Sequence, residues 1–302
     1  MRRRDFLRLS LAGAAGLAAA ACSRRVGIPS DVPVALQAAA AGEAERGARA
    51  GLMVFPGGQE FVAGRTQRLP LGLVDPEGFS ITGGSARAWV AAADGEAGAP
   101  AEALYHAYGT VLLRDDPRGF HVATIALPPP GLTDVLVSIE TGERALYGWT
   151  TVQTRAEPAT VDVGERAVPV DTPTTEDHRG VANLCTREPA CPLHDRTLRQ
   201  MLAAARPVVY TISSPLLCTS RTCGPVLGEV LTLHRRYGAR AAFVHAEPYR
   251  GEEPTQLAPA ATAWRLESEP WTFVIDAGGV VRARFEGPVV ADEIDNALRP
   301  LL

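Results

Sequence analysis

The chain contains no lysine, so all 30 of its basic residues are arginine. This absence excludes an enzyme that forms a Schiff base through a lysine amine, and it excludes a phosphate-binding P-loop, whose motif requires a lysine. Concentrated positive charge is also lacking, because 34 acidic residues bring the formal net charge to −4. We therefore expect no nucleic-acid partner.

The N-terminus lacks a hydrophobic run long enough for a comfortable transmembrane helix. Leu9–Ala21 is uncharged and rich in Ala, Leu and Gly, but a spanning helix needs about 20 apolar residues. A basic segment, Met1–Arg8, precedes it. This order is typical of a signal peptide. Within the basic segment, Arg3-Arg4-Asp5-Phe6-Leu7-Arg8 resembles the twin-arginine export signal.

The end of the hydrophobic run resembles a bacterial lipobox. Ala19-Ala20-Ala21 is followed directly by Cys22, which in a lipoprotein is lipidated and becomes the mature N-terminus. Ala19 stands where leucine or valine is more usual, and the alternative is ordinary cleavage after an A-x-A site. We predict a signal peptide over residues 1–22 and an extracytoplasmic lipoprotein, anchored to the membrane of the cell envelope through Cys22.

Four cysteines remain when Cys22 is set aside: Cys185, Cys191, Cys218 and Cys223. An even number in an exported protein is consistent with two disulfides. Four cysteines allow three pairings, and the local pairs, Cys185 with Cys191 and Cys218 with Cys223, need the least loop closure.

Two domains are expected downstream of a flexible tether at residues 23–48. Residues 49–155 contain short apolar or alternating segments separated by Gly, Pro and Asp, which predicts an all-β immunoglobulin-like sandwich. Its strands are expected at 51–55, 68–74, 86–91, 110–113, 121–127, 134–139 and 145–150. A linker rich in Pro, Thr and acidic residues follows at 156–180.

Residues 181–302 alternate between helical and strand patterns, which predicts an α/β domain. Helices are expected at 193–205, 226–237, 257–266 and 290–298, and strands at 207–212, 240–245, 271–275 and 280–285. Cys218 and Cys223 lie between the first strand and the second helix. Proline is tolerated only in the first turn of a helix, so Pro225 places the start of this helix between Arg221 and Gly224.

This C-terminal domain resembles the thioredoxin-like superfamily. The resemblance is carried by the strand, cysteine and helix order, by Glu269-Pro270-Trp271-Thr272-Phe273-Val274-Ile275-Asp276, and by the last helix. It implies a thioredoxin-like fold in which Pro270 is cis and lies against the active cysteines.

The match inside the superfamily has three candidates. Cys223-Gly224-Pro225-Val226 is similar to the thioredoxin motif with its second cysteine replaced by Val226. Cys218-Thr-Ser-Arg-Thr-Cys223 is similar to the bacterioferritin-comigratory peroxiredoxins, but Pro215 stands where their threonine is expected and their arginine is absent near Trp271. The copper-delivering Sco proteins use a related pair with a loop one residue shorter and a distant histidine.

The resemblance implies a membrane-anchored thiol–disulfide oxidoreductase. One thiolate of the Cys218/Cys223 pair attacks a substrate disulfide and the other cysteine resolves the mixed disulfide. The helix dipole favours Cys223 as the more acidic thiol, whereas the peroxiredoxin-like and Sco-like matches favour Cys218 as the attacking thiol, and we take Cys218. Pro270 would line the peptide groove and Trp271 would shape it. The expected partners are exported thiol or disulfide proteins, or a membrane electron donor.

Other functions remain open from the sequence. A copper(I) site would use Cys218, Cys223 and His245, because copper(I) favours thiolates with imidazole. Thiol peroxidase activity and a non-enzymatic lipoprotein with a structural disulfide are weaker alternatives. Cys185 and Cys191, with His194 beside them, are expected to form a structural disulfide or a second thiol pair that relays electrons.

Overall fold

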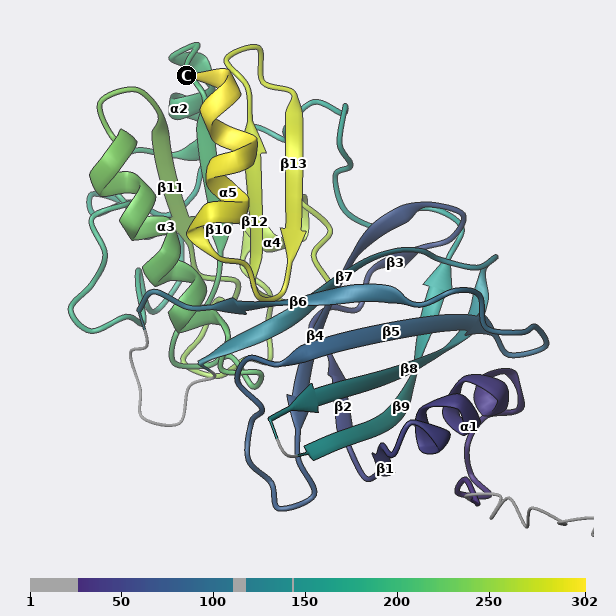
Figure 1. Cartoon of the computed structure of the whole chain (residues 1–302). Coiled ribbons are helices and arrows are strands. Elements are labelled where there is room, and N and C mark those ends of the chain that lie inside the picture. The colour runs from purple at the N-terminus through teal and green to yellow at the C-terminus, as the bar shows by residue number, and fades with distance from the viewer. Residues whose placement is uncertain (1–26, 111–117, 143) are drawn as a thin grey trace, which may run out of the picture.

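The computed structural model describes residues 27–110, 118–142 and 144–302, and Figure 1 shows two β-sheets packed side by side. The predicted signal peptide, with its twin-arginine motif and Cys22, lies outside the described residues, as does most of the strand expected at 110–113. No helix within the described ranges is long and apolar enough to cross a membrane.

The first sheet has nine strands and takes up most of the chain before residue 156. Along the sheet the strands run in the order β1-β9-β8-β5-β6-β7-β4-β2, and β3 pairs with β9. Their bounds are β1 Arg49–Ala50, β2 Met53–Pro56, β3 Phe61–Val62, β4 Thr66–Val74, β5 Ser85–Ala92, β6 Ala101–Ala107, β7 Gly119–Ala126, β8 Gly131–Thr141 and β9 Arg144–Arg155.

This sheet curls until its two ends approach each other. The backbone N–H groups of Gly51 and Leu52, just before β2, both donate to the carbonyl of Tyr147 in β9 at 3.1 Å. The approach is so close that a Cβ added to Gly148 would lie 1.8 Å from the carbonyl oxygen of Leu52. The immunoglobulin-like sandwich is therefore wrong: the strands form one continuous curled sheet around an apolar core instead of two separate facing sheets.

The segment before the sheet packs against it. A short 3-10 helix, η1 (Val34–Leu36), leads into helix α1 (Gln37–Glu45). Apolar residues of this segment join Trp89 and Tyr147 in one buried cluster. Glu43 is 1% exposed, accepts a hydrogen bond from Ser138 Oγ at 2.7 Å and pairs with Arg87 at 2.9 Å. Residues from 34 onward are thus fixed to the sheet, unlike the flexible tether predicted for 23–48.

The second sheet has four strands in the order β11-β10-β12-β13. Strands β10 (Val208–Ile212) and β11 (Ala242–Ala246) are parallel, whereas β12 (Trp271–Ile275) is antiparallel to both β10 and β13 (Val281–Glu286). Every residue of β10, β11 and β12 is buried, because helices and loops cover both faces.

Helices α3 (Cys223–Tyr237) and α5 (Ala291–Leu298) share one apolar cluster on one face of this sheet. The shorter helices α2 (Leu198–Ala203) and α4 (Pro259–Ala263) lie with the cluster on the other face, and a 3-10 turn, η2 (Arg299–Leu301), ends the chain. The elements expected here form, but α2 and α4 are shorter than the 193–205 and 257–266 predicted.

The predicted fold class is wrong for the C-terminal half as well. The described residues are mostly β, with only 18% helix, and they do not present a clear thioredoxin-like α/β domain beside a sandwich. The helices that do form are short: α2 begins after its capping residue Thr197, and the positive φ of 49° at Ala205 takes the backbone out of the helix.

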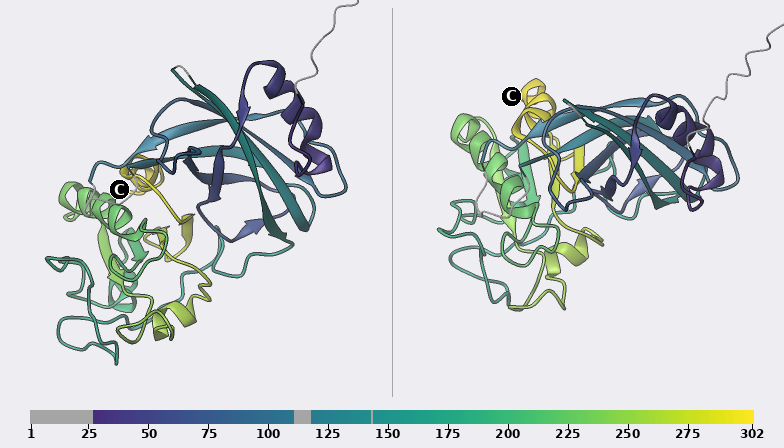
Figure 2. Two further views of the ribbon diagram at one scale, coloured as in Figure 1. Left: turned by 90° about the horizontal axis from the view of Figure 1, so that it is seen from below. Right: turned by 60° about the horizontal axis from the view of Figure 1, so that its bottom comes forward.

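The segment expected as a linker, 156–180, is packed and has no named helix or strand. Val161 and Ala167 are buried beside the four-stranded sheet, and Arg166 forms an isolated bridge with Val280. The two halves of the chain also contact each other directly, where the segment after β6 meets α3. Gly109 N–H donates to Glu229 Oε1 at 2.6 Å, and Figure 2 shows α1 at the far end of the molecule from this junction.

Candidate functional site

Cys218 and Cys223 lie where the buried strand β10 passes through a loop into helix α3. The helix begins at Cys223, with Pro225 in its first turn, which confirms the predicted start. Cys223 is fully buried and Cys218 is 6% exposed. Because Cys223 is buried behind the start of the helix, Cys218 is the more accessible thiol of the pair.

Hydrogen-bond donors surround the sulfur of Cys218. The Cys223 thiol and Ser220 Oγ, at 3.1 Å, donate to it, as do the backbone N–H groups of Thr222 and Cys223 at the helix N-terminus. Led by the bond from Cys223, these interactions lower the pKa of Cys218 to about 5, because they stabilise the thiolate.

Cys223 behaves in the opposite way. Burial, followed by its bond to Cys218, raises the pKa of Cys223 well above the usual value for a thiol. The expectation that the helix dipole makes Cys223 the more acidic thiol is therefore wrong, since desolvation of the buried sulfur outweighs the dipole. The backbone N–H groups of the first turn act on Cys218 instead.

Glu269 joins the two thiols, a residue that the sequence did not single out. One of its carboxylate oxygens and the two sulfurs all lie within 4.8 Å of one another. Tyr249 OH donates to Glu269 Oε2 at 2.6 Å, and burial raises the pKa of Glu269. Its place directly before Pro270 was the available signal. The Glu269–Pro270 peptide bond is cis, so Pro270 has the geometry that the resemblance implied.

A cleft of about 360 Å³ opens beside this group. One wall of the cleft is formed by Thr219, Ser220 and Thr222, from the loop between Cys218 and Cys223. Tyr249, after β11, and Glu269, before β12, line the cleft as well. Residues 56–59, at the end of β2 and just after it, complete the wall. The cleft therefore depends on both halves of the chain.

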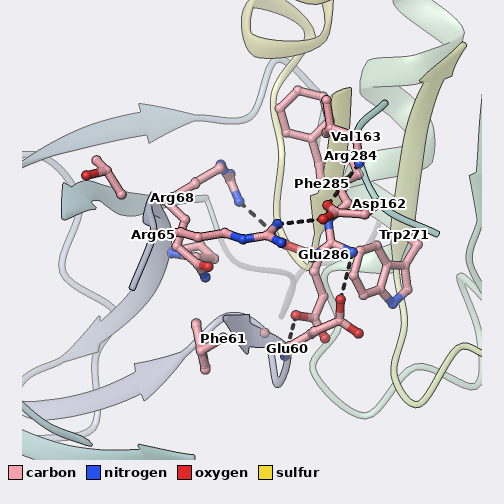
Figure 3. Close-up of a pocket in the computed structure, with 14 residues that line it drawn as sticks. Glu60, Phe61, Arg65, Arg68, Asp162, Val163, Trp271, Arg284, Phe285 and Glu286 are labelled. Atoms are coloured by element: carbon pink, nitrogen blue, oxygen red, sulfur yellow. Dashed lines mark hydrogen bonds and ion pairs between the residues drawn. The ribbon is translucent and has the colours of Figure 1, made fainter. Parts of the chain in front are cut away.

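Trp271 lies in a different pocket, of about 250 Å³, at the junction of the sheets (Figure 3). Its indole N–H donates to Ser268 Oγ at 3.1 Å, and the Arg284 guanidinium lies 5.6 Å from its ring centroid. Arg284 also pairs with Glu60 at 2.7 Å and Asp162 at 3.3 Å. This pocket is a network of paired charges that joins the two sheets, so Trp271 borders the junction and not the cysteine cleft.

The other two cysteines form a second group with two histidines. Cys185, Cys191, His194 and His245 bring one donor atom each to within 4.8 Å of one another. His245 ends up here because it lies in β11, next to β10, and its backbone N–H donates to the carbonyl of Leu193 at 3.3 Å. The structure thus groups His245 with Cys185 and Cys191, and not with Cys218 and Cys223, the pair beside which the copper hypothesis expected it.

All four of these cysteines are free thiols in the structure. The expected disulfides, Cys185 with Cys191 and Cys218 with Cys223, are not formed. The hydrogen bond from Cys191 lowers the pKa of Cys185, and the same bond raises the pKa of Cys191. Cys185 is therefore the more acidic of the two thiols in this group.

Comparison with protein-family models, with curated proteins and with solved structures finds no match for this chain.

Proposed function

We propose that this chain is an extracytoplasmic thiol–disulfide oxidoreductase in which Cys218 attacks and Cys223 resolves. The observation that carries the proposal is the opposite perturbation of the two thiols. Cys218 has a pKa lowered to about 5 and directly precedes Thr219 and Ser220, which line the cleft, whereas Cys223 is fully buried with a raised pKa. An attacking thiol must be a thiolate, and a resolving thiol must wait until the first bond forms.

In the first step the Cys218 thiolate attacks one sulfur of a substrate disulfide. A Cys218–substrate disulfide forms, the substrate S–S bond breaks, and one substrate cysteine leaves as a thiolate that takes up a proton from solvent. The low pKa of Cys218 keeps this nucleophile ionised at neutral pH.

In the second step Cys223 attacks the sulfur of Cys218. The Cys223 proton must first be removed, and the Glu269 carboxylate, within 4.8 Å, is the nearest base in the group. The Cys218–Cys223 disulfide forms and the second substrate thiolate leaves. Two electrons pass from the protein to the substrate, and the reverse sequence oxidises a substrate dithiol.

The cleft provides the recognition surface for this chemistry. Its polar side chains suit an extended segment of a substrate protein. The substrates are exported proteins with thiols or disulfides, and a membrane electron donor would reset the pair. This proposal includes the lipoprotein anchor at Cys22 and the cell-envelope location expected from the N-terminal sequence.

Trapping of the mixed disulfide tests the proposal. The Cys223→Ser variant cannot resolve, so we expect it to accumulate a covalent adduct with a disulfide peptide at Cys218, seen by mass spectrometry. Cys218→Ser should form no adduct and show no turnover. Unchanged turnover in Cys218→Ser and Cys223→Ser would overturn the proposal.

A further inference from the structure

The group of Cys185, Cys191, His194 and His245 has the dimensions of a tetrahedral metal site. His245 Nδ1 lies 3.3 Å from His194 Nε2, 3.5 Å from Cys191 Sγ and 3.8 Å from Cys185 Sγ. Cys191 Sγ lies 3.2 Å from His194 Nε2. Each residue therefore directs one donor atom to a common centre.

These separations can be compared with those of a zinc tetrahedron. Zinc bonds of about 2.3 Å to sulfur and about 2.05 Å to nitrogen place two nitrogens about 3.3 Å apart and a nitrogen and a sulfur about 3.6 Å apart. The nitrogen–nitrogen separation in the structure is 3.3 Å, and the nitrogen–sulfur separations are 3.2, 3.5 and 3.8 Å. A metal ion therefore needs only small adjustments of the side chains.

Hydrogen bonds with neighbouring backbone groups also keep the ligand atoms pointed toward the common centre. The Nε2 atom of His245 lies 2.9 Å from the carbonyl oxygen of Ser213, so it carries the proton and donates, which leaves the Nδ1 lone pair facing the sulfurs. The backbone N–H of Cys191 donates to Cys185 Sγ at 3.4 Å. His194 and His245 are 2% and 0% exposed. Hydrogen bonds of this kind orient metal ligands.

We propose that Cys185, Cys191, His194 and His245 bind one zinc(II) ion. Two thiolates and two neutral imidazoles form a neutral complex with the ion, and binding releases the protons of the two thiols. Side chains of the protein fill all four positions, which is typical of a structural zinc site and not of a catalytic one. The proposal does not depend on the redox chemistry of the other cysteine pair.

The site would fasten the loop between Cys185 and Cys191 to the segment that leads to Cys218. Thr186 Oγ1 already lies 3.3 Å from Ser214 Oγ and accepts a hydrogen bond from Leu216 N–H at 3.2 Å. Zinc on one side of Thr186 and these contacts on the other hold in place the loop that carries Cys218.

Zinc content tests the proposal. The full-length chain, reduced and then incubated with zinc chloride, is freed of unbound metal by gel filtration and analysed by elemental mass spectrometry. We expect one zinc ion per chain, and zinc content at least about tenfold lower in Cys191→Ser and His245→Ala. The control variant with Cys218→Ser and Cys223→Ser should keep one zinc ion.

Cobalt(II) provides a second measurement that needs no variant. Bound by the wild-type chain, it should give the intense visible absorption of tetrahedral cobalt with a thiolate charge-transfer band. Absence of bound zinc, an octahedral cobalt spectrum, binding of copper(I) in place of zinc, or a Cys185–Cys191 disulfide that persists in the purified protein would each overturn the proposal. Zinc retained in full by both ligand variants would overturn it as well.

Discussion

The reactivity of Cys218 should be almost independent of pH across the neutral range. Its pKa is lowered to about 5, first by the hydrogen bond from Cys223 and then by Ser220 and the backbone of the helix start. The sign follows directly: the thiolate persists as pH falls from 9 to 6 and is lost only as pH drops through about 5.

The size of the effect can be worked out from ionised fractions. A free cysteine with a pKa of about 8.5 is about 0.3% thiolate at pH 6 and about 76% at pH 9, so its alkylation accelerates about 240-fold. A thiol with a pKa of about 5 is about 91% thiolate at pH 6, so its rate rises by only about 10% over the same range. Burial slows the reaction at every pH and cancels in this ratio.

The assay is alkylation of the reduced full-length chain with iodoacetamide from pH 4 to pH 9, with each cysteine followed by peptide mass spectrometry. Cys223→Ala removes the largest cause of the shift, so its midpoint should move upward, whereas Cys223→Ser keeps a hydroxyl donor and should move less. A wild-type Cys218 midpoint between pH 8 and 9 would refute the reasoning.

Two further predictions concern the proton acceptor and the closure of the first sheet. Glu269→Gln should slow resolution of the mixed disulfide by about 100-fold or more, because it removes the base for Cys223, while attack by Cys218 continues. Rapid-quench kinetics would separate the two steps. Equal slowing of attack and resolution would contradict the role of Glu269. Gly148→Ala should lower the free energy of unfolding by about 3 kcal/mol or more, because its Cβ would meet the Leu52 carbonyl oxygen. The control Gly72→Ala, whose Cβ would have ordinary contacts, should change the free energy of unfolding by less than about 1 kcal/mol. Urea denaturation measures both, and equal effects would show that the sheet does not close at Gly148.

Local patterns predicted the elements of this chain better than their assembly. Alternation and turn residues located most strands because these signals act over neighbouring residues. Strand β6 was missed: its sequence, Ala101–Ala107, is rich in helix formers, and only pairing with β5 and β7 makes it a strand. The curling of the sheet depends on a contact between Gly148 and Leu52, far apart in sequence, and no local pattern encodes it.

For the candidate site too, local features could be predicted from the sequence and contacts between distant residues could not. The start of α3 followed from Pro225, since proline restricts the helix locally. The low pKa of Cys218 did not follow, because it depends on the hydrogen bonds that the folded loop and the helix start bring to its sulfur. Glu269 was missed, and His245 was assigned to the wrong cysteine pair. Glu269 lies about 50 residues after Cys218, and His245 lies about 60 residues after Cys185, so only the folded chain brings each pair together.

The reduction potential of the Cys218–Cys223 pair tests the central claim most directly. The full-length chain would be equilibrated in graded glutathione and dithiothreitol buffers, and the redox state of each cysteine read by alkylation and peptide mass spectrometry. The account predicts a reversible couple between about −120 and −270 mV, the range of exchange catalysts. A pair that stays oxidised below about −300 mV, or one that never closes, would contradict it.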